Sequence, residues 1–293
     1  MKLLVTGGTG FLGRRAAAHF AALGVQVLVP GRAQLDITED ASVRLWFAAN
    51  RPDAVLHCAA VSDTGACRRE PESTARVNVE GAARVAAACA ETGARLVFCS
   101  SDQVYAGSPL PGPHAETEHL APGNPYAQQK LEAERLCAAR CPDTVSLRLS
   151  WMYAVQSLPG EHGHFLSTLL AALRDPSLPL RWPVHDRRGI TDVSAVVDKL
   201  PAALLLPAGV YNFGAANDAD MYTTVREVLQ SAAVRAYLQN GSRADPLQRL
   251  VPDCQTFADA PRDIRMDPAH TAAAGIVFET TKQGLCAALE NAL

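Results

Sequence analysis

The stretch VTGGTGFLGR, residues 5–14, decides the fold of this chain. It continues an apolar run, KLLVT at residues 2–6, and leads into FLGRRAAAHFAALG at residues 11–24, where apolar side chains recur at helical spacing. A strand, a tight glycine turn and a helix N-terminus together bring backbone N–H groups and the positive end of a helix dipole up to a diphosphate. This order of elements predicts a nucleotide-binding turn.

The spacing Gly7-x-x-Gly10-x-x-Gly13 defines the turn more closely. A side chain at any of these glycines would block the approach of a diphosphate to the backbone. We therefore expect Gly7, Gly10 and Gly13, with Phe11 and Leu12 between them, to contact a dinucleotide cofactor.

The same alternation of elements continues to residue 150. Further apolar runs read as strands, at residues 26–30, 54–60, 95–100 and 144–150, and segments with helical periodicity lie at residues 40–51, 73–93 and 124–140. Strands that are apolar throughout are typical of parallel sheets covered by helices on both faces. We predict an α/β fold, a Rossmann-type doubly wound parallel sheet, in a dinucleotide-binding domain at residues 1–150.

The second half of the chain has a less regular pattern. It contains helical patterns at residues 164–175, 192–205 and 221–234, strand-like runs at 178–185 and 209–214, a polar stretch at 239–265 and a terminal helix. We expect residues 151–293 to form mainly a smaller α+β substrate lobe. Residues of about 190–214 are expected to pack back on the Rossmann domain.

Composition and charge exclude several classes of partner. The chain has 293 residues, a net charge of -3 and no basic run interleaved with aromatic residues, so nucleic acid is not an expected partner. The apolar run at the N-terminus is too short for a signal peptide or a membrane span. We expect a cytoplasmic protein without a membrane partner, and a homodimer is among the assemblies open to it.

Cysteine and histidine patterns do not predict a metal site. The eight cysteines are scattered through apolar segments and are expected to be free thiols. His162 and His164 are two residues apart and lack a carboxylate partner, so no metal is predicted there.

The residues after the second strand bear on the choice of cofactor. An acidic side chain there would hold a ribose 2′-hydroxyl, whereas an arginine would accept a 2′-phosphate. Arg32 lies at this place, and no acid precedes Asp36. NADPH is the predicted cofactor, NADH stays open, and the other interpretation of Arg32 is a solvated turn residue.

Three side chains form a candidate catalytic group. Tyr126 and Lys130 are four residues apart on a predicted helix, so they share one face. The ammonium group would lower the pKa of the phenol and let it exchange a proton with a carbonyl or alcohol. Ser100 is the last residue of the strand predicted at 95–100 and Ser101 follows it, at the sheet edge where ligands bind. A hydroxyl on Ser101 can hydrogen-bond the reacting oxygen. The alternative for the serines is a strand-end turn.

With these residues in place, the chain resembles an extended short-chain dehydrogenase/reductase of the dTDP-4-dehydrorhamnose reductase group. The resemblance covers roughly residues 1–170. It is carried by QLDITED, by the region from RPDAVLHCAA to VNVEGAARVA, by SSDQVYAG with serine for the usual threonine, and by LRLSWMYA, at residues 34–40, 51–86, 100–107 and 147–154.

The resemblance implies further roles around the cofactor. Asp36 and Ile37 would flank the adenine, and Lys130 would also hold the nicotinamide ribose. The residues implied to line or support the cofactor groove are Ala59, Ala60, Val61 and Asn78. Ser100, at the end of its strand, is a further candidate for cofactor contact. The implied reaction is hydride transfer from the nicotinamide to C4 of a nucleotide-linked 4-keto-6-deoxy sugar, with Tyr126 donating the proton.

The chain departs from the group in its second half. VHDRRGITDVS keeps Asp186, Gly189 and Thr191 of the family pattern but loses its glutamine and proline, and APRDIRMDPAH keeps only Pro261 and Asp267. Both departures concern the substrate more than the cofactor.

Four residues are candidates for substrate contact: Asp102, Trp151, Arg187 and Arg188. The two arginines could clamp a diphosphate in a bidentate manner, and Trp151 could form a pocket wall. Their alternatives are a solvated turn and a core aromatic, and Asp102 could equally be a helix cap.

Two other functions stay open. One is a sugar-nucleotide epimerase or dehydratase of the same extended family. Dehydratases generally have a pair of acidic residues beside the catalytic hydroxyl, whereas here Asp102 is followed by Gln103, which counts against dehydration. The other is a non-catalytic, dinucleotide-binding regulatory subunit, since the subfamily includes the regulatory β subunit of methionine adenosyltransferase.

Overall fold

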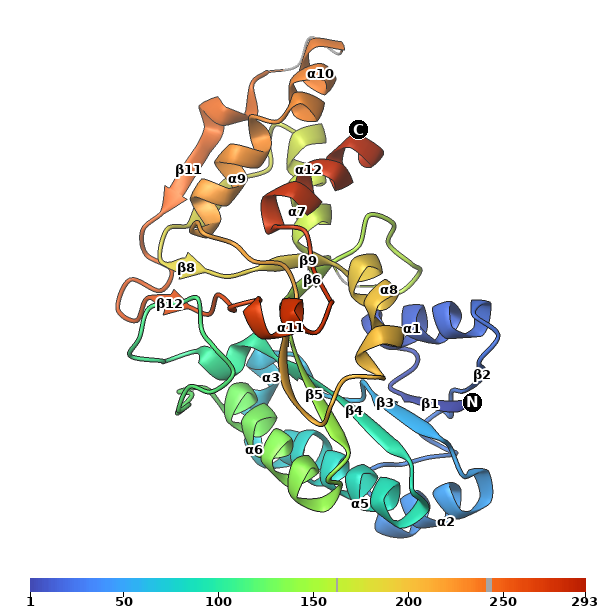
Figure 1. The fold of residues 1–293 in the computed structure, drawn as a ribbon. Coiled ribbons are helices and arrows are strands. Elements are labelled where there is room, and N and C mark those ends of the chain that lie inside the picture. Colours follow the sequence, from blue (N-terminus) through green and yellow to red (C-terminus); the bar gives the residue numbers. More distant parts are fainter. Residues whose placement is uncertain (162, 241–243) are drawn as a thin grey trace.

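The computed structural model describes residues 1–161, 163–240 and 244–293 and contains one central sheet (Figure 1). Six strands pair in parallel in the order β10-β5-β4-β3-β1-β2. Their bounds are β1 Lys2–Thr6, β2 Gln26–Leu28, β3 Ala54–His57, β4 Arg95–Ser101, β5 Thr144–Leu149 and β10 Gly209–Phe213. β2 lies on one side of β1 and β3 lies on the other, so the order of strands switches between β1 and β3. A ligand crevice is expected at the carboxyl ends of these two strands. The predicted Rossmann-type fold is confirmed.

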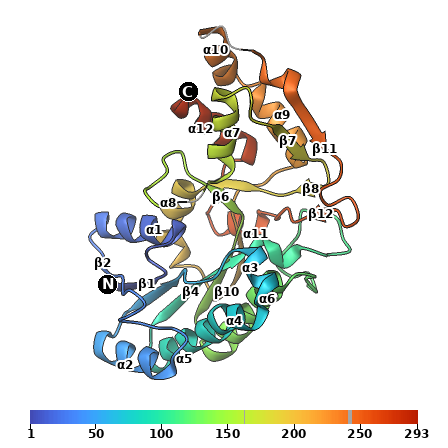
Figure 2. The same ribbon diagram turned by 180° about the vertical axis from the view of Figure 1, so that it is seen from behind.

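Helices cover both faces of the sheet (Figures 1 and 2). One face carries α1 (Phe11–Ala22) and α8 (Val193–Ala203), and the other carries α2 (Asp40–Asn50), α5 (Ala82–Thr92) and α6 (Pro125–Arg140). Side chains alternate along the strands, so Leu3 packs in the layer of α1 and Leu4 in the layer of α2 and α5. Burial of each such side chain stabilises the fold by about 1.5–3 kcal/mol.

The C-terminal elements form a second apolar cluster beyond the carboxyl ends of the sheet (Figure 1). Its elements are β6 Trp151–Tyr153, α7 Phe165–Arg174, β7 Leu180–Pro183, β9 Ile190–Asp192, α9 Met221–Leu229, α10 Ala232–Asn240, β11 Leu250–Asp253 and α12 Thr281–Ala292. Two-residue strands β8 (Asp186–Arg187) and β12 (Arg262–Asp263) pair beside it, and α11 spans Ala269–Ala273. Within residues 190–214, by contrast, α8 and β10 pack with the central sheet.

Local structure differs from the predicted elements in three places. The single helix predicted at 73–93 is α4 (Pro71–Ala75), a π-helical turn (Arg76–Gly81) and α5, and it follows an unpredicted helix α3 (Thr64–Arg69). The helix predicted at 221–234 breaks between α9 and α10, because the Ser231 hydroxyl accepts a hydrogen bond from the backbone N–H of Val234 and starts a new helix. The polar stretch includes a 3₁₀ turn (Pro246–Arg249) and β11.

In the parts of the chain that the structure describes, no helix has both the length and the apolar character to cross a bilayer.

Candidate active site

The glycine turn forms a cradle at the N-terminus of α1. Gly7 has a φ of 66°, and a Cβ atom there would lie 2.7 Å from the Ala59 nitrogen. A Cβ atom on Gly13 would lie 2.3 Å from the Gly7 carbonyl oxygen, so both positions require glycine. Gly10 is the N-cap of α1 and offers no side-chain acceptor to the first turn, which also holds no acidic residue. The backbone N–H groups in the first turn of α1 therefore suit the binding of a diphosphate.

A cleft of about 680 Å³ opens beside this cradle at the carboxyl ends of the strands. Most of the predicted site residues line it: Gly7, Gly10, Phe11, Leu12, Gly13, Ala60, Ser100, Ser101, Asp102, Tyr126, Lys130, Trp151 and Arg188. Residues that are distant in the sequence therefore meet in one cleft.

Other predicted residues lie outside the cleft lining. Arg32 is exposed after β2, and its Nε donates to an Asp36 carboxylate oxygen at 3.0 Å. Hydrogen bonds from Thr38, reinforced by Arg32, lower the pKa of Asp36 to about 2. Ile37 is buried and packs closely on Gly81. A Cβ atom added to Gly81 would lie 2.9 Å from the Ile37 side chain.

Asn78 holds the segment that includes Ala59 and Val61. Its side-chain oxygen accepts from the Val61 N–H at 2.7 Å, and its amide donates to the Val61 carbonyl at 3.0 Å. The Asn78 amide also donates to Gln129 of α6 at 2.8 Å. Asn78 lies in the π-helical turn, a feature frequent at functional sites, and it fixes the backbone after β3.

The helix cap at Asn124 positions the catalytic candidates on α6. The Asn124 side chain accepts from the Ala127 N–H at 2.9 Å, and Pro125 occupies the first helical position. Tyr126 and Lys130 follow on one face, 8% and 4% exposed. The Lys130 ammonium donates to the Cys99 carbonyl at 2.8 Å and lies 5.9 Å from the centre of the Tyr126 ring.

Burial dominates the protonation of this pair. It raises the pKa of Tyr126, with a hydrogen bond to Ser101 opposing the rise, and it lowers the pKa of Lys130. The structure thus differs from the expectation that the pKa of the phenol is lowered, because burial raises this pKa by more than the hydrogen bond to Ser101 lowers it.

Ser101 and Asp102 connect the end of β4 to the C-terminal elements. The Ser101 hydroxyl donates to the Asp102 carboxylate at 3.2 Å and accepts from the Gln103 N–H, which caps the 3₁₀ turn Asp102–Tyr105. Arg188 donates to the other Asp102 oxygen at 2.8 Å. The Arg188 guanidinium also lies 5.1 Å from the centre of the Trp151 ring.

The structure separates Arg187 from Arg188, for which a joint diphosphate clamp and a solvated turn were the two alternatives. Arg187 is exposed in β8, where it pairs with Asp263, whereas Arg188 is buried and lines the cleft. Successive residues of an extended segment point to opposite sides, so only Arg188 can meet a ligand in the cleft.

The whole chain, residues 1–293, matches the family described as RmlD substrate binding domain. The chain belongs to this family. A relative named dTDP-4-dehydrorhamnose reductase from Streptomyces griseus is 34% identical over 218 residues, which cover 71% of this chain and 69% of the relative. A second relative of that name, from Mycolicibacterium smegmatis, is 33% identical over 168 residues, 57% of this chain. The chain spans 50% of the length of that second relative.

A solved structure has the same overall fold as this chain. The crystal structure of dTDP-4-dehydrorhamnose reductase from Bacillus anthracis, in complex with NADP, superposes with a TM-score of 0.81. The superposition covers 98% of this chain and 96% of that chain at 19% identity. At this identity the likeness shows the shared fold.

The cleft of the present protein, a member of the RmlD substrate binding domain family, has further lining residues that were not predicted from the sequence. They include Thr9, Arg14, Cys58, Ser62, Cys99, Gln103 and Glu161. Glu161 pairs with Arg15 of α1 through both carboxylate oxygens, one of them at 2.9 Å from the guanidinium. Arg14 adjoins Gly13 and could have been found from the motif, whereas Glu161 comes from a loop far along the chain. His162 lies outside the described residues, and His164 caps α7.

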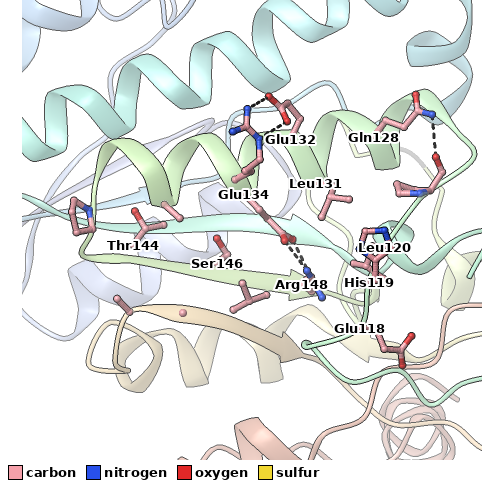
Figure 3. Close-up of a pocket in the computed structure, with 17 residues that line it drawn as sticks. Glu118, His119, Leu120, Gln128, Leu131, Glu132, Glu134, Thr144, Ser146 and Arg148 are labelled. Atoms are coloured by element: carbon pink, nitrogen blue, oxygen red, sulfur yellow. Dashed lines mark hydrogen bonds and ion pairs between the residues drawn. The ribbon is translucent and has the colours of Figure 1, made fainter.

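Figure 3 shows a second cavity, of about 860 Å³, between α6 and strands β5 and β10. Arg148 and Glu134 form a buried ion pair of 2.8 Å in its wall. Glu134 also accepts a hydrogen bond from Ser100, which lines the cleft. Among the described residues, the cavity wall includes none of the glycine turn, Ser101, Tyr126 or Lys130. The smaller cleft is therefore the candidate active site.

Among the described residues, no three His, Cys, Asp or Glu side chains group as a metal site would require.

Proposed function

We propose that the protein is an NADPH-dependent reductase of a nucleotide-linked 4-keto-6-deoxy sugar. The observation that carries the proposal is the meeting of Ser101, Tyr126 and Lys130 with the α1 glycine cradle in one cleft. The names of the relatives from Streptomyces griseus and Mycolicibacterium smegmatis support the same reaction.

The cradle of α1 would hold the diphosphate of the cofactor. Gly7, Gly10 and Gly13 present backbone rather than side chains there, and Arg32 stands after β2 where a 2′-phosphate would lie. The NADP in the Bacillus anthracis structure supports this choice of cofactor. When bound, NADPH supplies the hydride.

Tyr126 would deliver the proton to the sugar oxygen. Its raised pKa keeps the phenol protonated at neutral pH, which is the form that a proton donor needs. The Ser101 hydroxyl stands beside it and would orient the same oxygen. Lys130, held by the Cys99 carbonyl, would place its positive charge next to the phenolate that forms.

The substrate would enter between the sheet and the C-terminal elements. Trp151 offers an aromatic wall that is 37% exposed, and Arg188 offers a buried guanidinium paired with Asp102. We propose residues 151–293 as mainly the substrate lobe, apart from the sheet-packing part at about 190–214.

A panel of nucleotide-linked 4-keto-6-deoxy sugars tests the function. We expect loss of the reduced-nicotinamide absorbance with at least one member, and a rate at least about a hundredfold lower for Tyr126→Phe. If both proteins bind NADPH and neither turns over any member, the regulatory-subunit alternative replaces the reductase. If substrate changes without net NADPH oxidation, the epimerase or dehydratase alternative does.

We also propose a cytoplasmic location, because all eight cysteines are free thiols, as is usual in a reducing compartment. The homodimer stays a prediction, which sedimentation of the purified protein tests.

A further inference from the structure

Two thiols that the proposed reaction does not use lie together in the floor of the cleft. The Cys58 and Cys99 sulfur atoms are 3.6 Å apart, and both residues line the cleft. Cys58 directly follows β3 and Cys99 belongs to β4. The register of these strands pairs His57 with Phe98, so the two cysteines lie side by side. Both side chains point to the α1 face of the sheet.

The backbone at this place already suits a disulfide. Neighbouring strands lie about 4.8 Å apart, which is within the range of Cα separations of about 4.4–6.8 Å that disulfides adopt. Rotation of the two side chains brings the sulfur atoms closer, and a shift of the two strand ends toward each other completes the bond. Among the described residues, no other two cysteine sulfurs make such a contact.

We propose that Cys58 and Cys99 are a reversible oxidation site, closed by a peroxide into a disulfide that weakens cofactor binding. Cys58 is the more exposed of the two, so its sulfur attacks the peroxide oxygen. The O–O bond breaks, one oxygen leaves as water or an alcohol, and Cys58 becomes a sulfenic acid. The Cys99 sulfur then attacks the Cys58 sulfur, and the second oxygen leaves as water. Two thiols are oxidised and one peroxide is reduced.

The disulfide would act on two parts of the cofactor site. The Cys99 carbonyl holds the Lys130 ammonium at 2.8 Å, and Lys130 is the residue expected at the nicotinamide ribose. On the other strand, Gly7 packs so closely on the backbone after β3 that a Cβ atom would lie 2.9 Å from the Cys58 carbonyl carbon. Drawing the two sulfurs together therefore shifts both the lysine anchor and the glycine cradle.

The coupling between oxidation and cofactor binding is reciprocal. If the disulfide weakens NADPH binding, bound NADPH must disfavour the disulfide by the same factor. A dinucleotide in the cleft would also cover the thiols. The hydrogen bond with Cys99 and burial raise the pKa of Cys58, with Lys130 opposing, so little reactive thiolate is present at neutral pH and the oxidation should be slow.

The test uses the full chain with Cys254→Ser, which removes the exposed thiol. After treatment with hydrogen peroxide, we expect mass spectrometry of unreduced peptides to find Cys58 joined to Cys99 with loss of two hydrogens. Dithiothreitol should reverse the link, and NADPH present during oxidation should prevent it. NADPH fluorescence should report about tenfold weaker binding to the oxidised protein.

Three single variants distinguish a specific disulfide from general oxidation. Cys58→Ala and Cys99→Ala, each made alone, should lose the link and the change in NADPH binding, whereas Cys137→Ala, a buried thiol on the other face of the sheet, should keep both. The proposal is overturned if Cys58 stops at a sulfinic acid, if it links to another cysteine, or if the disulfide forms and NADPH binds as before. The mass readout is independent of the proposed function, which fails instead if the reduced protein does not bind NADPH.

Discussion

Arg188 donates a hydrogen bond of 2.8 Å to the carboxylate of Asp102, and both side chains are more than nine-tenths buried. Arg188 comes from the turn between β8 and β9, and Asp102 from the end of β4. The pair therefore joins the C-terminal elements to the strand that carries Ser101. Breaking it should affect both stability and substrate binding.

Removal of one partner should be costly, because the other charge stays buried. We expect Arg188→Met to lower the free energy of unfolding by about 3–5 kcal/mol. The double variant Arg188→Met with Asp102→Asn should recover much of this loss. Urea unfolding of the four proteins measures the coupling, and purely additive losses would show that the two groups do not depend on each other.

The stability loss of Arg188→Met should depend on pH. Burial raises the pKa of Asp102, and Arg188 opposes that rise, so the pKa of the carboxyl group should rise further in this variant. When a carboxyl group has a higher pKa in the folded protein than in the unfolded protein, the folded protein loses stability as pH rises from the unfolded pKa through the folded pKa. The deficit should therefore grow from acidic to neutral pH. A deficit that is constant over this range would mean that Asp102 is not the group left unpaired.

The cradle predicts a specific effect of Gly13→Ala. The added methyl group would lie 2.3 Å from the Gly7 carbonyl oxygen, so the turn must open. Strain of about 1–3 kcal/mol corresponds to NADPH binding that is about ten- to a hundredfold weaker. The control is Gly123→Ala, since nothing lies within 4 Å of that position. Equal NADPH affinities for the two variants would argue against the cradle as the cofactor site.

Arg32 should determine which dinucleotide is preferred. Arg32→Ser removes a charged partner of the 2′-phosphate, so NADPH affinity should fall by about ten- to a hundredfold while NADH affinity changes little. Arg44→Ser is the control, because Arg44 is also exposed and pairs with an aspartate four residues away. Titration of both cofactors measures the ratio, and an unchanged ratio would make Arg32 a solvated turn residue.

The pH profile of the reaction should follow Tyr126. Its pKa lies above the usual value for a tyrosine, so the acid stays protonated across neutral pH. The turnover rate for reduction should be flat there and fall only as pH rises into the alkaline range. A rate that increases from neutral to alkaline pH would require a deprotonated phenol and would exclude Tyr126 as the proton donor.

The sheet could be predicted because its signals are local. Each strand carries its own apolar run, and the order of strand, glycine turn and helix is contiguous at Gly7 to Gly13. The break at Ser231 was not predictable from periodicity, because the apolar spacing runs on through the residue that caps the next helix.

The relative placement of the site residues could be predicted only where a motif sets their spacing. Tyr126 and Lys130 follow from helical spacing, whereas the side of the chain that Arg188 faces depends on a two-residue strand pairing in the divergent half. The contact of Cys58 with Cys99 depends on the register of two strands about forty residues apart, for which the sequence has no local signal.

The most direct test of the reductase proposal follows the hydride itself. A nucleotide-linked 4-keto-6-deoxy sugar is incubated with NADPH that carries deuterium at its transferable position, and the product is examined by NMR. We predict one deuterium at C4 of the sugar for each NADPH oxidised, with Tyr126→Phe at least about a hundredfold slower. A sugar that returns without deuterium at C4, from protein that binds both NADPH and the sugar, would contradict the account.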